Sequence, residues 1–369
     1  MTAAFVARRM LLRSRAGTLV TVAAVAATVA LQLFLFAVHE GVREGSTAYV
    51  RETSADIWVA QKNSDNILKS SSLLPASLSE DIARIPGVAA ASPLLRVITK
   101  AEIRGRRSST LFLLAFDPAT RLGAPPRIVT GTSNIRDGEL VLDRSFARKY
   151  ALRAGDTLAI QGHRFRIAGL SDGTNALVSQ FAFARFTDGE SLLGIPGIAS
   201  FILVRVSGDR AVVAQRIRDA HPDLAVYDAR DFIQAHEDEM NSGVLPVFAA
   251  AAGFGAVVCV LLVALTLYNA VLAHREDYAT LKAIGASSSF LLRVVLGQAL
   301  LATAFGALAG GAIARGLAPL LLELVPALSL RFTPRLLFVF PACLVIGALA
   351  ACAPVVLLRR IDPEEVFRA

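Results

Sequence analysis

The stretch GTLVTVAAVAATVALQLFLFAV, residues 17–38, contains no Asp, Glu, Lys or Arg. A bilayer core about 30 Å thick takes roughly 20 helical residues to cross, so this stretch is long enough to span a membrane once. It also exceeds the apolar core of a cleaved signal peptide, which is about 7–15 residues, and no clear small-x-small cleavage site follows it. We therefore expect residues 17–38 to form a retained transmembrane helix.

Three further stretches without charged residues are long enough to span a membrane, namely residues 244–273, 294–314 and 336–358. The strongly polar side chains inside the four stretches are Gln32, Asn269 and Gln298. The whole chain is 54% hydrophobic and only 18% charged, whereas soluble domains average about 25% charged residues. The composition excludes a purely soluble enzyme and predicts an α-helical membrane protein with four transmembrane helices.

The segment between the first and second spans, residues 39–243, has a different composition. It holds 25 of the 38 Lys and Arg residues and 24 of the 30 Asp and Glu residues. Its charge is therefore nearly balanced, and the excess behind the net charge of +8 lies at the flanks of the spans. Basic residues at these flanks set topology and contact anionic lipid. We expect a soluble domain here, membrane lipid as a contact, and no binding of nucleic acid.

The orientation follows from the basic residues in short loops, which stay on the cytoplasmic side. We expect three cytoplasmic segments, the tail 1–16, the loop 274–293 and the tail 359–369. Their basic residues are Arg8, Arg9, Arg13 and Arg15, then Arg275, Lys282 and Arg293, and finally Arg359, Arg360 and Arg368. The domain 39–243 and the loop 315–335 then face outward. This predicts a multi-pass protein of the inner (plasma) membrane with both termini in the cytoplasm.

The outer domain contains two strand–helix–strand patterns, one near each end. The expected elements are a strand at 56–60, a helix at 78–85 and a strand at 88–97, then a strand at 201–206, a helix at 209–220 and a strand at 224–228. Their similar layout predicts a split α/β part made from residues 55–99 and 201–230. Residues 100–200 read as a β-rich insert.

The insert shows a hairpin pattern of alternating apolar residues. We expect a strand at 155–160, a turn at Gly162-His163 and a strand at 165–167. A strand at 138–142 precedes them, with a short helix at 143–150 in between.

Several catalytic motifs are missing from the sequence. It has no Gly-Lys dipeptide, so it lacks the Walker A phosphate-binding loop and cannot be a P-loop ATPase by itself. No Gly-x-Ser-x-Gly nucleophile motif occurs, and the five histidines are scattered. We expect no catalytic residue, no metal site and no cofactor bound by this chain. The spans also lack the mid-membrane charges typical of ion-coupled pumps.

Small residues recur every four positions along the third span, at Ala302, Gly306, Gly310 and Ala314. Such a ridge lets a second helix approach closely. The partner helix belongs either to the same chain or to a second copy, and the sequence leaves both alternatives open.

Three local stretches carry a resemblance to a known family. They are HREDYATLKAIGA at 274–286, RRIDPEEVFR at 359–368, and ADIWV at 55–59 followed by IPGV at 85–88. With the order of one span, an outer domain and three spans, they resemble the MacB/FtsX/LolC-type (type VII) permeases of ABC transporters, with features of the DevC/HrtB-like branch. The resemblance covers essentially the whole chain.

The resemblance implies a homodimer of permeases bound to two copies of a separate ABC ATPase, which binds ATP and Mg²⁺. It also implies that force transmitted across the membrane drives export or efflux of an amphipathic substrate, such as a drug, lipid, peptide or haem. A periplasmic adaptor is a further candidate partner. Two other roles stay open, an FtsX-like scaffold that activates an extracytoplasmic partner and a LolC-like permease for lipoprotein extraction.

The stretch 274–286 resembles the segment through which permeases of this family contact their ATPase, here called the coupling segment. Within it, the resemblance and the helical spacing single out seven residues. A short helix there can insert into a groove on the ATPase, with polar contacts from its first turn and an apolar face from Leu281 and Ile284. Gly285 is expected to end the helix with a positive φ. The alternative is an interfacial helix that contacts only lipid. The candidate coupling residues are Arg275, Glu276, Asp277, Leu281, Lys282, Ile284 and Gly285.

Polar residues at the outer ends of the first two spans suggest one substrate. His39 and Glu40 follow the first span, and His236 and Met240 precede the second. His and Met are haem axial ligands, so these four residues are candidate contacts for haem as a substrate. The alternative is that they are solvated polar residues of two stalk helices.

Overall fold

The structure is a computed structural model that describes residues 3–13, 15–67, 72–173, 180–243, 245–273, 275–325, 328 and 330–351. It divides into two compact units. The helical unit comprises Met1–Glu40, Val247–Leu321 and Leu330–Ala369, and the outer unit comprises Gly41–Pro246 and Leu322–Ser329.

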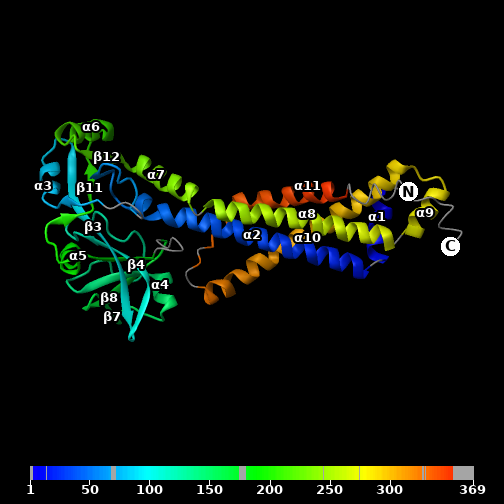
Figure 1. The fold of residues 1–369 in the computed structure, drawn as a ribbon, viewed down its shortest axis with the longest axis horizontal. Helices are drawn as coiled ribbons and strands as arrows, with labels where there is room; N and C mark the ends of the chain where they lie inside the picture. Colours follow the sequence, from blue (N-terminus) through cyan, green and yellow to red (C-terminus); the bar gives the residue numbers. More distant parts are fainter. Residues whose placement is uncertain are drawn as a thin grey trace. The chain divides into compact units, whose positions relative to one another are not determined.

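The helical unit is built from apolar helices (Figure 1). Its elements are α1 (Ala3–Arg13), α2 (Arg15–Glu52), α8 (Leu245–Ala273), α9 (Arg275–Ala283), α10 (Ser288–Leu324), the 3₁₀ helix η1 (Pro334–Phe338) and α11 (Val339–Ala350). Within the described residues, α2, α8 and α10 are long and apolar enough to cross a membrane. Residues 334–350 form a shorter apolar helix. The remainder of the expected fourth span and the tail 359–369 lie outside the described residues.

Two elements differ from the sequence-based expectation. The expected tail 1–16 contains α1, in which Ala7 is fully buried and Met10 packs on the helical core while Arg8 and Arg9 are exposed. This apolar stripe is too short to stand out against the basic residues around it. Helix α10 continues beyond Arg315 to Leu324, so the first part of the expected loop 315–335 is helical.

The small-residue ridge of α10 packs against α2 of the same chain. A Cβ added to Gly306 would lie 2.5 Å from Cβ of Val25, and one added to Gly310 would lie 2.6 Å from the carbonyl oxygen of Ala26. The helix that packs on these two glycines therefore belongs to the same chain, which is one of the two alternatives that the sequence left open.

The outer unit contains a mixed ten-stranded sheet, as far as the chain is described, in the order β12-β1-β11-β3-β4-β9-β6-β8-β5, with β7 paired to β3 and β8. Its strands are β1 (Ile57–Gln61), β3 (Val88–Ile103), β4 (Arg106–Phe116), β5 (Ile128–Gly131), β6 (Glu139–Asp143), β7 (Thr157–Ile160), β8 (His163–Ser171), β9 (Gln180–Arg185), β11 (Phe201–Val206) and β12 (Leu224–Asp228). A separate small pair joins β2 (Leu74–Pro75) and β10 (Ile198–Ala199). Its helices are α3 (Leu78–Ala83), α4 (Arg144–Lys149), α5 (Phe186–Leu193), α6 (Arg210–Ala220) and α7 (Ala229–Ser242).

The two ends of the outer unit meet in one sheet. Strand β11 lies between β1 and β3, and β12 lies on the other side of β1. Helices α3 and α6 share an apolar core on one face of these strands, in which Ile82, Val213 and Ile217 are buried with Ile57 and Val204. Short runs of consecutive apolar residues, such as residues 57–60 and 201–204, explain why both ends were recognisable in the sequence.

The insert is continuous with this sheet. Strand β3 runs through the expected boundary at residues 99–100, and its later part pairs with β4 on one side and β7 on the other. The pairings β3-β4-β9-β6-β8-β7 return to β3 and form a closed ring around a separate apolar core, which includes Leu113, Phe165 and Phe146. The split part and the insert therefore share strand β3.

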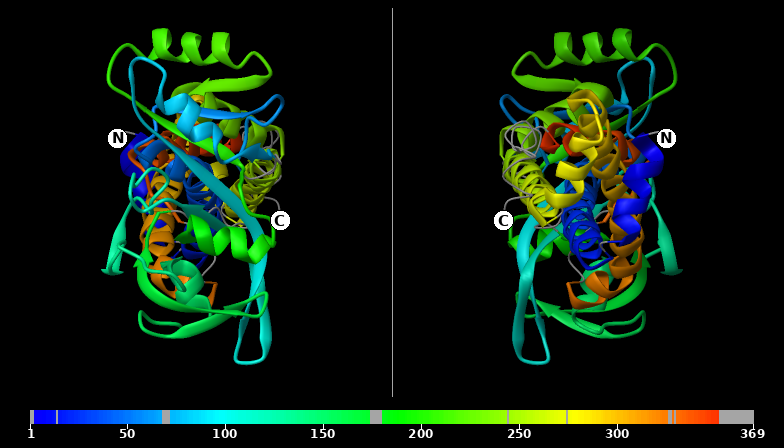
Figure 2. Two further views of the ribbon diagram at one scale, coloured as in Figure 1. Left: turned by 90° about the vertical axis from the view of Figure 1, so that its left-hand side faces the viewer. Right: turned by 90° about the vertical axis from the view of Figure 1, so that its right-hand side faces the viewer.

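The expected turn at Gly162-His163 is shifted by one residue. Ile160 pairs with His163, so the turn residues are Gln161 and Gly162, with φ angles of 49° and 85°. Two positive φ angles are typical of a type I′ turn, which matches the twist of the strands. Arg104 and Gly105 form the same kind of turn at the tip of the β3–β4 hairpin, which projects beyond its neighbours (Figure 2).

An aromatic cluster joins α2 and α7 to the sheet. Trp58 stacks on Phe232 of α7 with 4.6 Å between ring centroids, and Tyr49 of α2 packs edge-on against Trp58. The hydroxyl of Tyr49 also donates a hydrogen bond of 2.9 Å to the carbonyl of Gly123. The last turns of α2 are therefore fixed in the core of the outer unit.

Candidate functional site

The candidate site is helix α9, which lies in the segment expected to contact an ATPase. Its C-terminal end forms a Schellman motif, since the N–H of Ala286 donates to the carbonyl of Leu281 (2.9 Å) and that of Gly285 to Lys282 (3.1 Å). Gly285 has a φ of 91°. The prediction of a left-handed glycine that ends this helix is confirmed.

One side of α9 is anchored in the helical core. Tyr278 is only 2% exposed, and its hydroxyl donates a 3.0 Å hydrogen bond to Oε1 of Gln298 on α10. Burial raises the pKa of Tyr278 to about 12, so the phenol remains a donor at neutral pH. Tyr278 was not among the candidate residues. Its signal in the sequence is its position three residues before Leu281, on the same side of the helix.

The other side of α9 is exposed. Ile284 is 76% exposed, and Glu276 and Thr280 are exposed at four-residue spacing before it. Leu281, by contrast, packs against the helical core. The expectation that Leu281 and Ile284 form one apolar face is therefore wrong, because Ile284 continues the exposed side of Glu276 and Thr280 while Leu281 lies on the side of the core.

The remaining coupling candidates are placed as follows. Asp277 and Lys282 are half-buried, and each has an interaction partner in the chain. The side chain of Arg275 lies outside the described part of the structure. The exposed surface of α9 is thus formed mainly by Glu276, Thr280 and Ile284.

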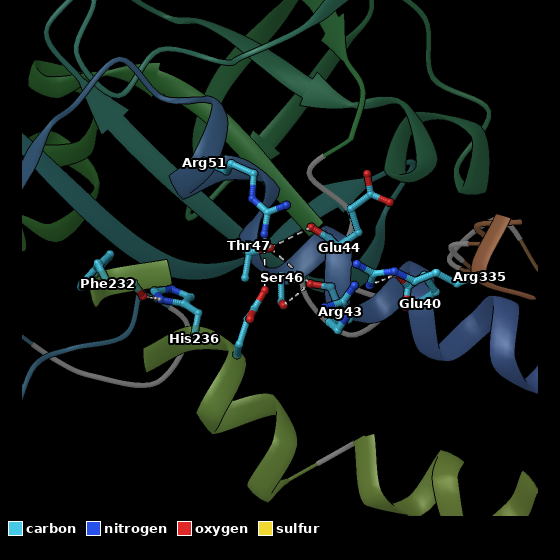
Figure 3. A network of polar contacts seen from close by, with 10 residues as sticks. Glu40, Arg43, Glu44, Ser46, Thr47, Arg51, Phe232, His236 and Arg335 are labelled. Atoms are coloured by element: carbon cyan, nitrogen blue, oxygen red, sulfur yellow. Dashed lines mark hydrogen bonds and ion pairs between the residues drawn. The ribbon is translucent and has the colours of Figure 1, made fainter. Parts of the chain in front are cut away.

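His236 is a core residue of the outer unit (Figure 3). It is fully buried, its Nε2 accepts a 3.0 Å hydrogen bond from the N–H of Ile67, and its Nδ1 donates to the carbonyl of Phe232 at 2.8 Å. Burial lowers the pKa of His236 to about 4, so the ring is neutral. Both nitrogens are occupied, so the expectation that His236 ligates haem is wrong.

Two of the other three haem candidates, His39 and Glu40, belong to the helical unit rather than to the outer unit. Glu40 pairs with Arg335 at 3.7 Å in the helical unit (Figure 3). His39 is half-buried in that unit, whereas half-buried Met240 belongs to α7 of the outer unit. Among the described residues, no cluster of three or more His, Cys, Asp or Glu side chains could hold a metal ion. The four candidates had been grouped because all of them lie close to a span in the sequence.

We expect the outer unit to lose stability in mild acid because of His236. Its pKa in the folded state lies below the unfolded value of about 6.5, so its contribution is complete above pH 6.5 and is lost as the pH falls towards 4. The loss should reach about 3 kcal/mol in free energy of unfolding. Urea unfolding of the full chain in detergent, followed by Trp58 fluorescence, measures it, since Trp58 is the only tryptophan and stacks on Phe232.

A His236→Gln variant, although less stable at pH 7, should lack this pH dependence. His163→Gln, which changes an exposed histidine of the same unit, should retain it. An unchanged pH dependence in His236→Gln would contradict the assignment.

The long apolar helices and the α/β domain indicate an integral membrane protein with a domain outside the bilayer. Residues 18–220 match the MacB-like periplasmic core domain and residues 249–363 match the C-terminal domain of FtsX-like permeases. The chain belongs to the MacB/FtsX family of ABC transporter permeases, and such a permease implies a partner ATPase.

Relatives of this chain match it along nearly their whole length. An uncharacterized ABC transporter permease of Mycobacterium tuberculosis is 24% identical over 343 residues, which cover 91% of each chain. One of Mycobacterium bovis is 24% identical over 340 residues, covering 92% of this chain and 91% of the relative.

Two solved outer domains are also similar to this chain. The periplasmic region of MacB from Actinobacillus actinomycetemcomitans has a TM-score of 0.40 at 13% identity and covers 51% of this chain and 95% of its own. The extracellular domain of the transporter YknZ from Gram-positive bacteria has a TM-score of 0.37 at 10% identity, with 47% and 100% covered.

Proposed function

We propose that this chain is the permease of an ABC exporter in which a separate ATPase binds the exposed side of α9 and transmits force to the outer domain. The observation that carries the proposal is the two-sided character of α9. Its exposed side offers Ile284 and Glu276 to a partner, while buried Tyr278 is hydrogen-bonded to Gln298 of α10. A displacement of α9 would therefore move α10 with it. In this arrangement both termini are cytoplasmic.

The continuity of α2 supports transmission of force rather than passage of solute. It is one uninterrupted helix from Arg15 to Glu52, and Tyr49 near its end is locked into the aromatic cluster of the outer unit. Two surface ion pairs, Arg51 with Glu237 and Arg127 with Glu52, tie the same end to its neighbours. The spans offer no charged side chain for a solute path.

We also propose that the chain acts as a homodimer in contact through α8. The apolar residues Phe254 and Leu261 of α8 are exposed. Only 17% of the most apolar 18-residue stretch of this helix is buried in the described structure. The substrate we propose is an amphipathic molecule, which the absence of charged side chains within the expected spans favours over an ion. Haem is no longer favoured as the substrate, because His236 is buried and both its ring nitrogens are hydrogen-bonded.

The test is co-purification of the full chain with a candidate ABC ATPase from the same organism. We expect native mass spectrometry to show two copies of each chain, and ATP hydrolysis to change when the permease is present. Free ATPase with unchanged hydrolysis would contradict the proposal. Stimulation of ATP hydrolysis by an amphipathic compound would support export. Stimulation of hydrolysis only by an extracytoplasmic protein would indicate the scaffold role.

A further inference from the structure

An apolar groove lies on the helical unit between α2, α10 and the start of α11. It has a volume of about 460 Å³, which is within the ordinary range for a ligand site. Its walls include Leu33 of α2, Leu308 of α10 and Leu337 of η1, with Phe340 of α11. Gly311 forms part of its floor, where a Cβ would approach Phe340 to 3.1 Å.

Arg315 is the charged residue among the described residues that line this groove. Arg315 follows the charge-free run 294–314, is exposed, and lies with its guanidinium carbon 5.6 Å from the ring centroid of Phe332. As far as the chain is described, Arg315 makes no ion pair, whereas nearby Arg335 is paired with Glu40. The groove thus combines apolar walls with one uncompensated positive charge.

This combination matches one class of occupant. A lipid at the bilayer interface has an apolar chain joined to a phosphate, and Arg binds phosphate oxygens through several N–H groups. Leu308 and Leu337 are both more than 60% exposed, and a lipid chain would cover them. A peptide or helix without an acidic residue would fill the apolar walls but leave the charge of Arg315 unpaired.

We propose that this groove binds one anionic phospholipid, with an acyl chain along Leu308 and Leu337 and the phosphate on Arg315. The groove lies near Glu40 of α2, since Arg335 of η1, between the groove residues Pro334 and Leu336, pairs with Glu40. In the proposed topology it belongs to the outward leaflet. A lipid held there would stabilise the contact of η1 and α11 with α2 and α10.

The test places a tryptophan in the groove of the full chain. Leu337→Trp is reconstituted into vesicles that contain brominated phosphatidylglycerol or brominated phosphatidylcholine, and quenching of tryptophan fluorescence is measured. Trp58 is buried in the outer unit and gives a constant background, measured in the unsubstituted chain. We expect half-maximal quenching by brominated phosphatidylglycerol at about five-fold lower mole fraction than by brominated phosphatidylcholine. One arginine near anionic lipid contributes about 1 kcal/mol, which corresponds to this factor.

Three matched variants decide the origin of the preference. In the Leu337→Trp background, Arg315→Gln should abolish it, whereas Arg293→Gln, at the other end of α10, should leave it unchanged. A tryptophan at exposed Val345 of α11, outside the groove, should show no preference.

Three results would overturn the proposal. They are equal quenching by both lipids in Leu337→Trp, a preference that survives Arg315→Gln, and the absence of quenching by either lipid. The last result would show that a second copy or another protein covers the groove.

Discussion

Replacing Ile284 by Glu is expected to weaken binding of the partner ATPase by about 10- to 100-fold. Ile284 is 76% exposed at the end of α9, and burial of an isoleucine side chain contributes about 1.5–3 kcal/mol. Each ~1.4 kcal/mol is a tenfold change in affinity, and a carboxylate without a partner adds its own cost of desolvation. The fold should be unaffected, because the side chain makes few contacts within the chain.

The measurement is the affinity of the purified permease for the ATPase, together with ATP hydrolysis by the complex. The matched control is Ile195→Glu, which introduces the same charge at a 50% exposed isoleucine of the outer unit. This control should bind the ATPase normally, because in the proposed topology it lies on the other side of the membrane. Equal loss in both variants, or normal binding of Ile284→Glu, would refute the role of α9.

Replacing Gly310 by Leu is expected to prevent stable packing of α10 on α2. Even a Cβ at Gly310 would lie 2.6 Å from the carbonyl oxygen of Ala26, and a backbone atom cannot move aside without separating the helices. Overpacking by a single methyl group costs about 1–3 kcal/mol, so Gly310→Ala should be destabilised and Gly310→Leu should yield little folded protein. Thermal unfolding in detergent and the monodisperse fraction after size exclusion measure both effects.

Gly316 provides a matched control on the same helix. A Cβ there would meet no atom within 4 Å, so Gly316→Leu should leave stability nearly unchanged. If the ridge instead contacted a second copy, Gly310→Leu would alter the oligomeric state while the monomer stayed stable. That result would contradict the packing seen here.

The parts of the fold that the sequence predicted are those with local signals. A charge-free run of 22 residues indicates a span, and short apolar runs indicate strands such as β11 and β12, whose bounds agree with the prediction. Gly285 was predicted because the conformation that ends a helix in this way favours glycine. In each case the deciding interaction lies within a few residues of the chain.

The parts that were missed depend on distant residues. The parallel pairing of β4 with β9 and the closed ring of strands have no local signature, so the insert could be read only as β-rich. His236 was grouped with His39 because both lie near a span. Its true partner is the N–H of Ile67, 169 residues away in sequence. Tyr278 was missed for the same reason, because its burial depends on Gln298.

The position of β11 in the sheet has a consequence for biosynthesis. The partners of β1 are β11 and β12, so Ile57 has no strand neighbour until Val204 and Asp228 have crossed the membrane. At about 5–20 residues per second this takes roughly 7–30 s of synthesis. During that time β1 exposes an unpaired, hydrophobic edge of the kind that aggregates. Export of this permease should therefore depend on a holding chaperone outside the membrane until the last strands arrive.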